Sequence, residues 1–228
     1  RTNPAIGLSH LLSAFRAPYL WTTVKVSLMV AGAQGGGYAL SIWMPTYLRT
    51  VRHLSPSSTG GFLLIQILGA LFGFLIGAWL SDAIGRRMTF MLSAIGSLIM
   101  VLIYMFVPMG NIALLFVGIP LNVMLLMKFP PMGPFMTELY PTAVRGNAQG
   151  FCYNAGRAIG AMFPTLVGVL SESMPLGLAI AVFSVMAFGL MIVMLMMLPE
   201  TRGRRLDSLD ATAPATPVDL LGSEEVAR

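Results

Sequence analysis

The sequence predicts an all-α membrane protein in which six transmembrane helices form one bundle. Only 10% of the 228 residues are charged and 56% are hydrophobic, whereas about a quarter of a soluble domain of this length would be charged. The mean hydropathy is +0.79. Long uncharged stretches can supply helices of about 20 residues, which cross roughly 30 Å of hydrocarbon. Lipid is therefore the expected surrounding of most of the chain.

Charged and turn-forming residues delimit the six predicted spans. The first span begins after Lys25, and the turn-like stretch SPSSTGG opens the second. Forty uncharged residues separate Arg87 from Lys128, too many for one crossing, and the PMGN turn at 108–111 divides them because Pro and Gly favour turns. The polar turn SESMP separates the last two spans. The spans are residues 26–48, 54–81, 88–107, 112–137, 146–170 and 176–198.

Arginines distinguish the two sides of the predicted bundle. An even number of spans puts both ends of this chain on one side, and that side holds eight arginines against two on the other. Cytoplasmic loops carry the excess of Lys and Arg, so the arginine-rich side is predicted to be cytoplasmic. The eight are Arg1, Arg16, Arg86, Arg87, Arg145, Arg202, Arg204 and Arg205, and the two are Arg49 and Arg52.

Three segments are expected along the chain. Residues 1–20 are a cytoplasmic linker or amphipathic segment, residues 21–198 the six-helix transmembrane bundle, and residues 199–228 a cytoplasmic tail. The tail is rich in Asp, Ala, Thr and Pro, which favours disorder. Because the chain begins with Arg1 rather than Met and shows no signal peptide, we expect it to be part of a longer protein.

The composition argues against several other kinds of protein. The single Cys152 excludes an internal disulfide and a Cys-rich metal site, and neither His10 nor His53 shares a motif with an acidic residue. No metal site and no cofactor are therefore predicted. The basic residues behind the net charge of +5 are scattered, which argues against nucleic acid as a partner. A membrane enzyme would need a His or acidic cluster inside the spans, which contain none, so no catalytic residue is predicted.

Glycines and prolines inside the spans predict how the helices meet. Small residues four apart let helix backbones approach closely. Such glycines are Gly69, Gly73 and Gly77 in the second span, and Gly156 and Gly160 in the fifth. The stretch FPPMGPF at 129–135 puts three prolines and a glycine in the fourth span. Because Pro removes a backbone donor and kinks helices, this stretch is predicted to break the span and to act as a gate.

Arg157 lies near the middle of the fifth predicted span, with Asn154 one turn away and Tyr153 close by. A buried Arg costs at least about 2.5 kcal/mol in a membrane, so it normally has a partner or a function. The acids nearest the spans all lie at their rims, namely Asp82, Glu138, Glu172 and Glu200. The partner of Arg157 is therefore an acid elsewhere in the protein, backbone carbonyls, or an anionic substrate. A guanidinium suits a carboxylate because it donates two parallel hydrogen bonds.

Other polar residues inside the spans are further candidates for a binding site. Gln34, Tyr38 and Ser41 share one face of the first span and are expected either to bond a neighbouring helix or to line a cavity. Lys128, halfway along the fourth span, is the second candidate cation. It could instead extend its ammonium to the membrane surface or stabilise the proline-rich break.

The stretch GAWLSDAIGRR at 77–87 places a charged cluster at the end of the second span. Gly85 is expected to reverse the chain, since Gly alone adopts positive φ without strain. Arg86 and Arg87 hold the short loop in the cytoplasm. Asp82 is expected to pair with Arg86 or to cap the N-terminus of a neighbouring helix.

Three motifs resemble those of the major facilitator superfamily. GAWLSDAIGRR is similar to its loop signature Gly-x-x-x-Asp-x-x-Gly-Arg-Arg, while TELYPTAVRG (137–146) and PETRG (199–203) resemble signatures of its sugar-porter-like branch. They occur in the family's order at the predicted span boundaries. The resemblance covers nearly the whole chain and implies the C-terminal six-helix half of such a protein. An N-terminal six-helix half is then expected to precede Arg1 in the same polypeptide.

The resemblance also implies a cytoplasmic gating network that latches one access state. The matching residues are Asp82, Arg86, Arg87, Glu138, Arg145 and Glu200. Exposed salt bridges contribute at most about 1 kcal/mol each, and a switch between two states of similar energy needs only such a bias. The alternative is that these residues are solvated charges flanking the spans.

The function that the resemblance implies is secondary active transport by alternating access. The stretch GYALSIWMPTYL (37–48) resembles bacterial aromatic- and organic-acid/proton symporters, and two cations without an acid inside the spans suit an anion. Proton-coupled uptake of a small organic or aromatic carboxylate across a bacterial inner membrane is therefore expected. The candidate substrate-binding residues are Arg157, Asn154, Tyr153, Gln34, Tyr38 and Lys128. A sugar or polyol porter and a non-transporting membrane sensor on the same fold remain alternatives.

Overall fold

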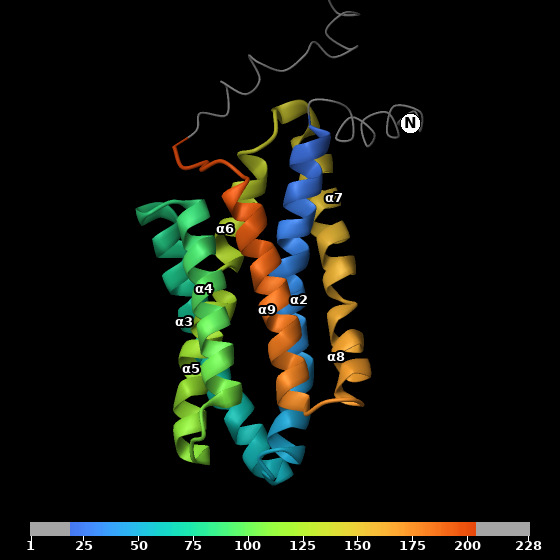
Figure 1. Cartoon of the computed structure of the whole chain (residues 1–228). Coiled ribbons are helices and arrows are strands. Elements are labelled where there is room, and N and C mark those ends of the chain that lie inside the picture. Colours follow the sequence, from blue (N-terminus) through green and yellow to red (C-terminus); the bar gives the residue numbers. More distant parts are fainter. Residues whose placement is uncertain (1–18, 204–228) are drawn as a thin grey trace, which may run out of the picture.

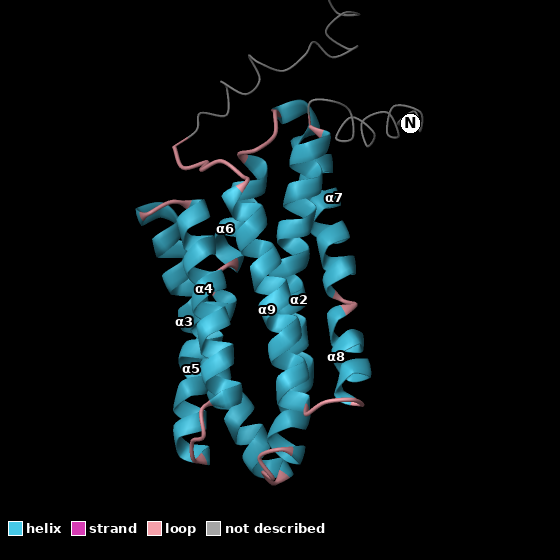
Figure 2. Cartoon of the chain, in the orientation of Figure 1, coloured by secondary structure: helices cyan, strands magenta, loops and turns pink. Residues whose placement is uncertain are grey.

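The computed structural model describes residues 19–203. These residues contain eight α-helices and no strands (Figure 2). The helices are α2 (Leu20–Thr50), α3 (Pro56–Ala83), α4 (Arg86–Phe106), α5 (Asn111–Leu126), α6 (Phe129–Thr137), α7 (Thr142–Gly160), α8 (Phe163–Ser171) and α9 (Leu176–Met196). The predicted all-α class is confirmed. Nearly all of the expected linker, and the expected tail beyond residue 203, lie outside the described residues.

The eight helices stack into six long rods, because α6 continues α5 and α8 continues α7 (Figure 1). The start of α2 and the end of α9 lie at the same end of the bundle, together with the α3–α4 and α6–α7 connections (Figure 1). This arrangement agrees with an even number of crossings. We call this end of the bundle the α3–α4 end.

Four of the described helical units are long and apolar enough to cross a membrane: α3, α4, the α5–α6 unit (Asn111–Thr137) and α9. The rods at the first and fifth predicted spans do not meet this criterion. Helix α2 has 31 residues, but glycines and polar side chains lower its hydropathy. Because α2 packs against α9, α7 and α8 and is buried along most of its length, its residues need not be as apolar as lipid-facing ones.

The position predicted for the break in the fourth span was wrong. The stretch FPPMGPF forms most of α6, and the helix is interrupted just before it, at Met127 and Lys128. Pro130 stands in the first turn of α6, where the missing N–H has no helical partner to lose. Pro130 and Pro131 therefore start a new helix rather than disrupt one, and Pro134 lies inside α6.

The fifth span contains a break that the sequence analysis did not predict. Helix α7 ends at Gly160 and α8 begins at Phe163, with Ala161 and Met162 between them. Pro164 stands in the first turn of α8. A proline lacks the N–H that would bond the carbonyl four residues earlier, and its ring clashes with that carbonyl, which here belongs to Gly160. Pro164 was therefore the signal for this break.

The predicted glycine contacts are confirmed. A Cβ placed on Gly73 of α3 would lie 2.6 Å from the carbonyl oxygen of Val123 on α5. A Cβ on Gly160 of α7 would lie 2.8 Å from the backbone nitrogen of Gly35 on α2. Only a residue without a side chain permits these two backbone approaches.

Candidate functional site

The turn between α3 and α4 is short, as predicted. Asp82 lies in the last turn of α3 and Arg86 is the first residue of α4, so that only Ile84 and Gly85 separate the helices. Gly85 has φ of +103°, which confirms its predicted role in reversing the chain. The turn places the Arg86 side chain among three helix ends.

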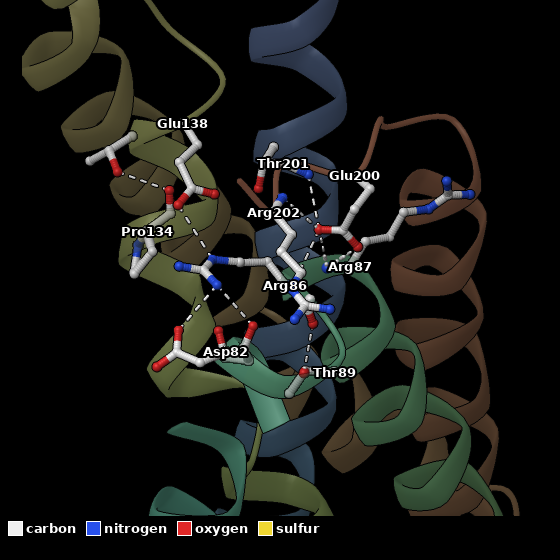
Figure 3. Close-up of polar contacts among 12 residues, drawn as sticks. Asp82, Arg86, Arg87, Thr89, Pro134, Glu138, Glu200, Thr201 and Arg202 are labelled. Carbon is white, nitrogen blue, oxygen red and sulfur yellow. Dashed lines mark hydrogen bonds and ion pairs between the residues drawn. The ribbon is translucent and has the colours of Figure 1, made fainter. Parts of the chain in front are cut away.

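Arg86 joins the ends of α3 and α6 (Figure 3). Its Nη1 lies 3.1 Å from Asp82 Oδ1 and donates to the Ser81 carbonyl at 2.9 Å, while its Nε lies 3.3 Å from Glu138 Oε1. The Asp82 side chain is 81% exposed, whereas those of Arg86 and Glu138 are 18% and 15% exposed. Water screens the Asp82 pair much more, so the Glu138 pair is the stronger contact.

Glu200 binds the start of α4 instead of a guanidinium. Its carboxylate accepts hydrogen bonds from the backbone N–H of Arg86 at 3.1 Å and of Arg87 at 3.2 Å (Figure 3). It also accepts from the backbone N–H groups of Thr201 and Arg202. A negative charge at a helix N-terminus satisfies unpaired donors and interacts favourably with the helix dipole. The capping role that was one alternative for Asp82 therefore belongs to Glu200.

The other two predicted members of the network contact backbone carbonyls. Arg87 Nη2 donates to the Met196 carbonyl at 3.3 Å, and Arg145 Nε donates to the Tyr140 carbonyl at 3.2 Å. No carboxylate among residues 19–203 lies within ion-pair distance of either guanidinium. We call Asp82, Arg86, Glu138 and Glu200 the rim cluster. That these charges gate transport remains a prediction.

A central cavity lies between α2 and the α5–α6 junction. Its volume is about 110 Å³, and Gln34, Tyr38 and Ser41 line it from α2. Lys128 and Phe129 line it from the junction. Three of the six predicted binding residues, Gln34, Tyr38 and Lys128, therefore meet at one place.

Lys128 is buried inside the bundle, with only 1% of its surface exposed. Its Nζ donates to the carbonyl oxygen of Ala33 on α2 and lies 5.7 Å and 5.4 Å from the ring centroids of Phe129 and Phe188. Among residues 19–203 no carboxylate is within ion-pair distance of this ammonium. The ammonium therefore does not extend to the membrane surface, which was one of its predicted alternatives.

The structure separates Arg157 from the central cavity. We expected a buried arginine, but the side chain is exposed in the last turn of α7, and so is that of Asn154, whose Nδ2 donates to the Gly150 carbonyl at 2.8 Å. Tyr153 is partly buried, and its hydroxyl accepts from Gln34 Nε2 at 3.5 Å. Within this chain α2 covers only the opposite stripe of α7, which contains Cys152 and Gly156. Burial of Arg157 in the whole protein therefore stays a prediction.

Two further cavities adjoin the central one. The Tyr153 cavity, of about 540 Å³, is lined by Phe74, Phe129, Met132, Gly133, Met136, Gly146, Gln149, Gly150 and Tyr153. The Gln66 cavity, of about 230 Å³, is lined by Leu40, Ser41, Met44, Leu63, Gln66, Ile67, Ala70, Leu121, Asn122 and Leu125. Sequence reasoning missed Gln66 and Asn122, although an amide inside an otherwise apolar span was a usable signal for each.

Comparisons with known proteins place this chain among membrane transporters. Residues 5–213 match the family described as "Sugar (and other) transporter". The chain is 36% identical over 213 residues to a probable 4-methylmuconolactone transporter of Cupriavidus pinatubonensis, a match that covers 92% of this chain and 50% of that protein. It is 31% identical over 162 residues to a cis,cis-muconate transport protein of Acinetobacter baylyi, covering 68% of this chain and 37% of that one.

A more distant relative is the sialic acid transporter of Escherichia coli, which is 26% identical over 190 residues, covering 82% of this chain and 46% of that protein. The chain thus spans about half the length, or less, of these relatives. The family match extends over most of the chain and agrees with the helical architecture and the three motifs. This chain belongs to the sugar (and other) transporter family of the major facilitator superfamily.

Proposed function

We propose that this chain is the C-terminal half of a secondary active transporter that takes up small organic or aromatic carboxylates together with protons. The observation that carries the proposal is the buried ammonium of Lys128, which faces a cavity and has no acidic partner among residues 19–203. An uncompensated cation inside a membrane protein is costly and marks a site for an anion. The names of two relatives, which refer to muconate and to a muconolactone, support the same substrate class.

An N-terminal six-helix half is the proposed partner of this chain. The exposed side chains of Asn154 and Arg157 are polar, and lipid is a poor surrounding for them. A second half packed over this face of α7 would bury both residues at its interface. In this arrangement Arg157, Asn154 and Tyr153 would face substrate from α7, while Gln34, Tyr38 and Lys128 would face it from the central cavity.

The proposed location is the bacterial inner membrane, with both ends of this chain in the cytoplasm. The uneven distribution of arginines supports this orientation. The α3–α4 end, with the rim cluster, would then face the cytoplasm, and Arg52 would lie on the outer side. Protons would accompany the substrate, carried by an acid of the N-terminal half.

A sugar or polyol porter is the second candidate. Gln34, Gln66 and Asn122 line adjoining cavities with neutral amides, and amides of this kind hydrogen-bond hydroxyl groups. Lys128 distinguishes the two proposals, because a neutral sugar gives no reason to bury an ammonium.

Uptake by the full-length protein, including the preceding half, tests the proposal. In proteoliposomes with an acidic exterior, we expect accumulation of labelled cis,cis-muconate or benzoate that a protonophore abolishes, because protons drive it. Labelled glucose and xylitol serve as matched neutral probes. Accumulation of the neutral probes alone would favour the porter, and flux of none of the four would contradict carboxylate transport.

A further inference from the structure

The three cavities adjoin one another in a series. The Gln66 cavity and the central cavity share Ser41 and Leu125, and the central cavity and the Tyr153 cavity share Phe129. The Tyr153 cavity includes Met136, close to the α3–α4 end of α6, whereas the Gln66 cavity includes Met44, near the opposite end of α2. The break between α5 and α6 places Lys128 at the middle member of the series.

The ammonium of Lys128 is incompletely satisfied in this position. It has three N–H donors, and the contacts of the described residues give it one hydrogen bond, to the Ala33 carbonyl. The rings of Phe129 and Phe188 attract the charge through their faces but accept no conventional hydrogen bond. An ammonium held in this way retains capacity for an oxygen acceptor that enters the central cavity.

The size of the central cavity limits what can enter it. Its volume of about 110 Å³ is smaller than the roughly 150 Å³ of a cavity that binds benzene. A carboxylate group fits, but the body of an aromatic or diene acid must extend into an adjoining cavity. The Gln66 cavity, about 230 Å³ with mostly apolar lining, and the Tyr153 cavity, about 540 Å³, both have room for such a body.

We infer that Lys128 is the residue that binds the substrate carboxylate, in the central cavity between α2 and the α5–α6 break. The Ala33 carbonyl is its partner when the site is empty, and the incoming carboxylate takes over that hydrogen bond. Gln34 and Tyr38 supply further donors from the same cavity wall. This inference rests on the proposed function and names the atom, Lys128 Nζ, that gives the site its preference for anions.

A purely structural role for Lys128 makes a different prediction. If the hydrogen bond to Ala33 served to hold α6 against α2, its loss would lower stability. If the charge is kept for substrate, Lys128→Met should leave the unfolding temperature of the purified protein unchanged or raise it, since a buried cation without an acid partner costs stability. The same variant should bind carboxylates at least tenfold more weakly.

Chemical restoration of the charge provides the decisive test. In full-length protein with Cys152 replaced by Ser, Lys128→Cys should reduce the affinity for cis,cis-muconate at least tenfold. Treatment with 2-aminoethyl methanethiosulfonate adds an ammonium to that cysteine and should restore most of the affinity. Methyl methanethiosulfonate adds a neutral group, is the matched control, and should restore none.

Several outcomes would overturn the inference. These are unchanged affinity in Lys128→Cys, equal restoration by both reagents, restoration by neither in folded protein, and failure of both Lys128 variants to fold. Failure of the proposed function is recognised separately, because the unsubstituted protein would then take up no carboxylate. Carboxylate uptake with normal affinity in Lys128→Met would contradict the inference alone.

Discussion

Arg86 and Lys128 are both largely hidden from solvent, yet their surroundings differ in kind. Arg86 has carboxylates from α3 and α6 beside it at the edge of the bundle, whereas Lys128 has a backbone carbonyl and two aromatic rings in the middle. Removal of Arg86 would leave Glu138, which is only 15% exposed, without a counter-charge among residues 19–203. Removal of Lys128 would deprive no charged side chain among the described residues of an ion-pair partner. From this contrast we expect the rim charge to stabilise the helix ends, whereas the central charge is the one that we propose for binding.

The largest expected effect on stability is that of Arg86→Met. Loss of one member of a buried ion pair costs about 3–5 kcal/mol, and the partial exposure of this pair reduces the expected loss to about 2–3 kcal/mol. Denaturant titration of the purified protein, followed by tryptophan fluorescence, measures it. Arg86→Lys is the matched control and should lose less, because it keeps the charge. A loss below about 0.5 kcal/mol for Arg86→Met would contradict the contrast with Lys128.

Replacement of Glu200 by Gln should have an intermediate effect. Gln keeps an oxygen acceptor but loses the charge that faces the start of α4, so we expect a loss of about 1 kcal/mol. The amides of Arg86 and Arg87 should exchange hydrogen faster, because the Glu200 carboxylate is their hydrogen-bond acceptor. Hydrogen-exchange mass spectrometry of the first turn of α4 measures this change. Unchanged exchange there would show that Glu200 does not cap the helix in solution.

The smallest effect is expected for Asp82→Asn. Its side chain is 81% exposed and pairs with Arg86 at i,i+4 spacing, so the loss in stability should be at most about 0.5 kcal/mol. A small bias can still shift an equilibrium between access states, and we expect a shift toward the inward-facing state. State-dependent cysteine labelling of the full-length protein would detect it. A stability loss as large as that of Arg86→Met would show that the rim cluster behaves as a single unit.

Much of the fold was predictable because a membrane imposes strong local rules. A helix that crosses lipid must be long and mostly apolar, and this requirement, together with the charged and turn residues between the spans, located the six rods. Gly85 predicted the chain reversal, because few other residues adopt positive φ. The glycines of α3 and α7 predicted close helix contacts, because a side chain would not fit there. The helix break at residues 161–162 was missed only because Pro164 was not weighed.

The candidate site was less predictable, because helical periodicity gives the face of a residue but not what lies opposite. Periodicity predicted the face that Gln34 and Tyr38 share, and the structure places both side chains beside a cavity. The nearly complete burial of Lys128 was not predicted, because neighbouring helices decide it. Phe188, whose ring lies beside Lys128, is on α9, distant in the chain.

The sequence by itself determined the membrane class, the rods, the tight α3–α4 turn and the family motifs, because each depends on residues close together in the chain. Only the tertiary structure decided that Glu138 rather than Asp82 is the better-shielded partner of Arg86, that Glu200 caps α4, and that Lys128 is buried without an acidic partner among the described residues. These outcomes depend on which helix ends and faces meet. Burial and pairing of a charge are set by atoms from several helices at once, and no single segment of sequence contains that information.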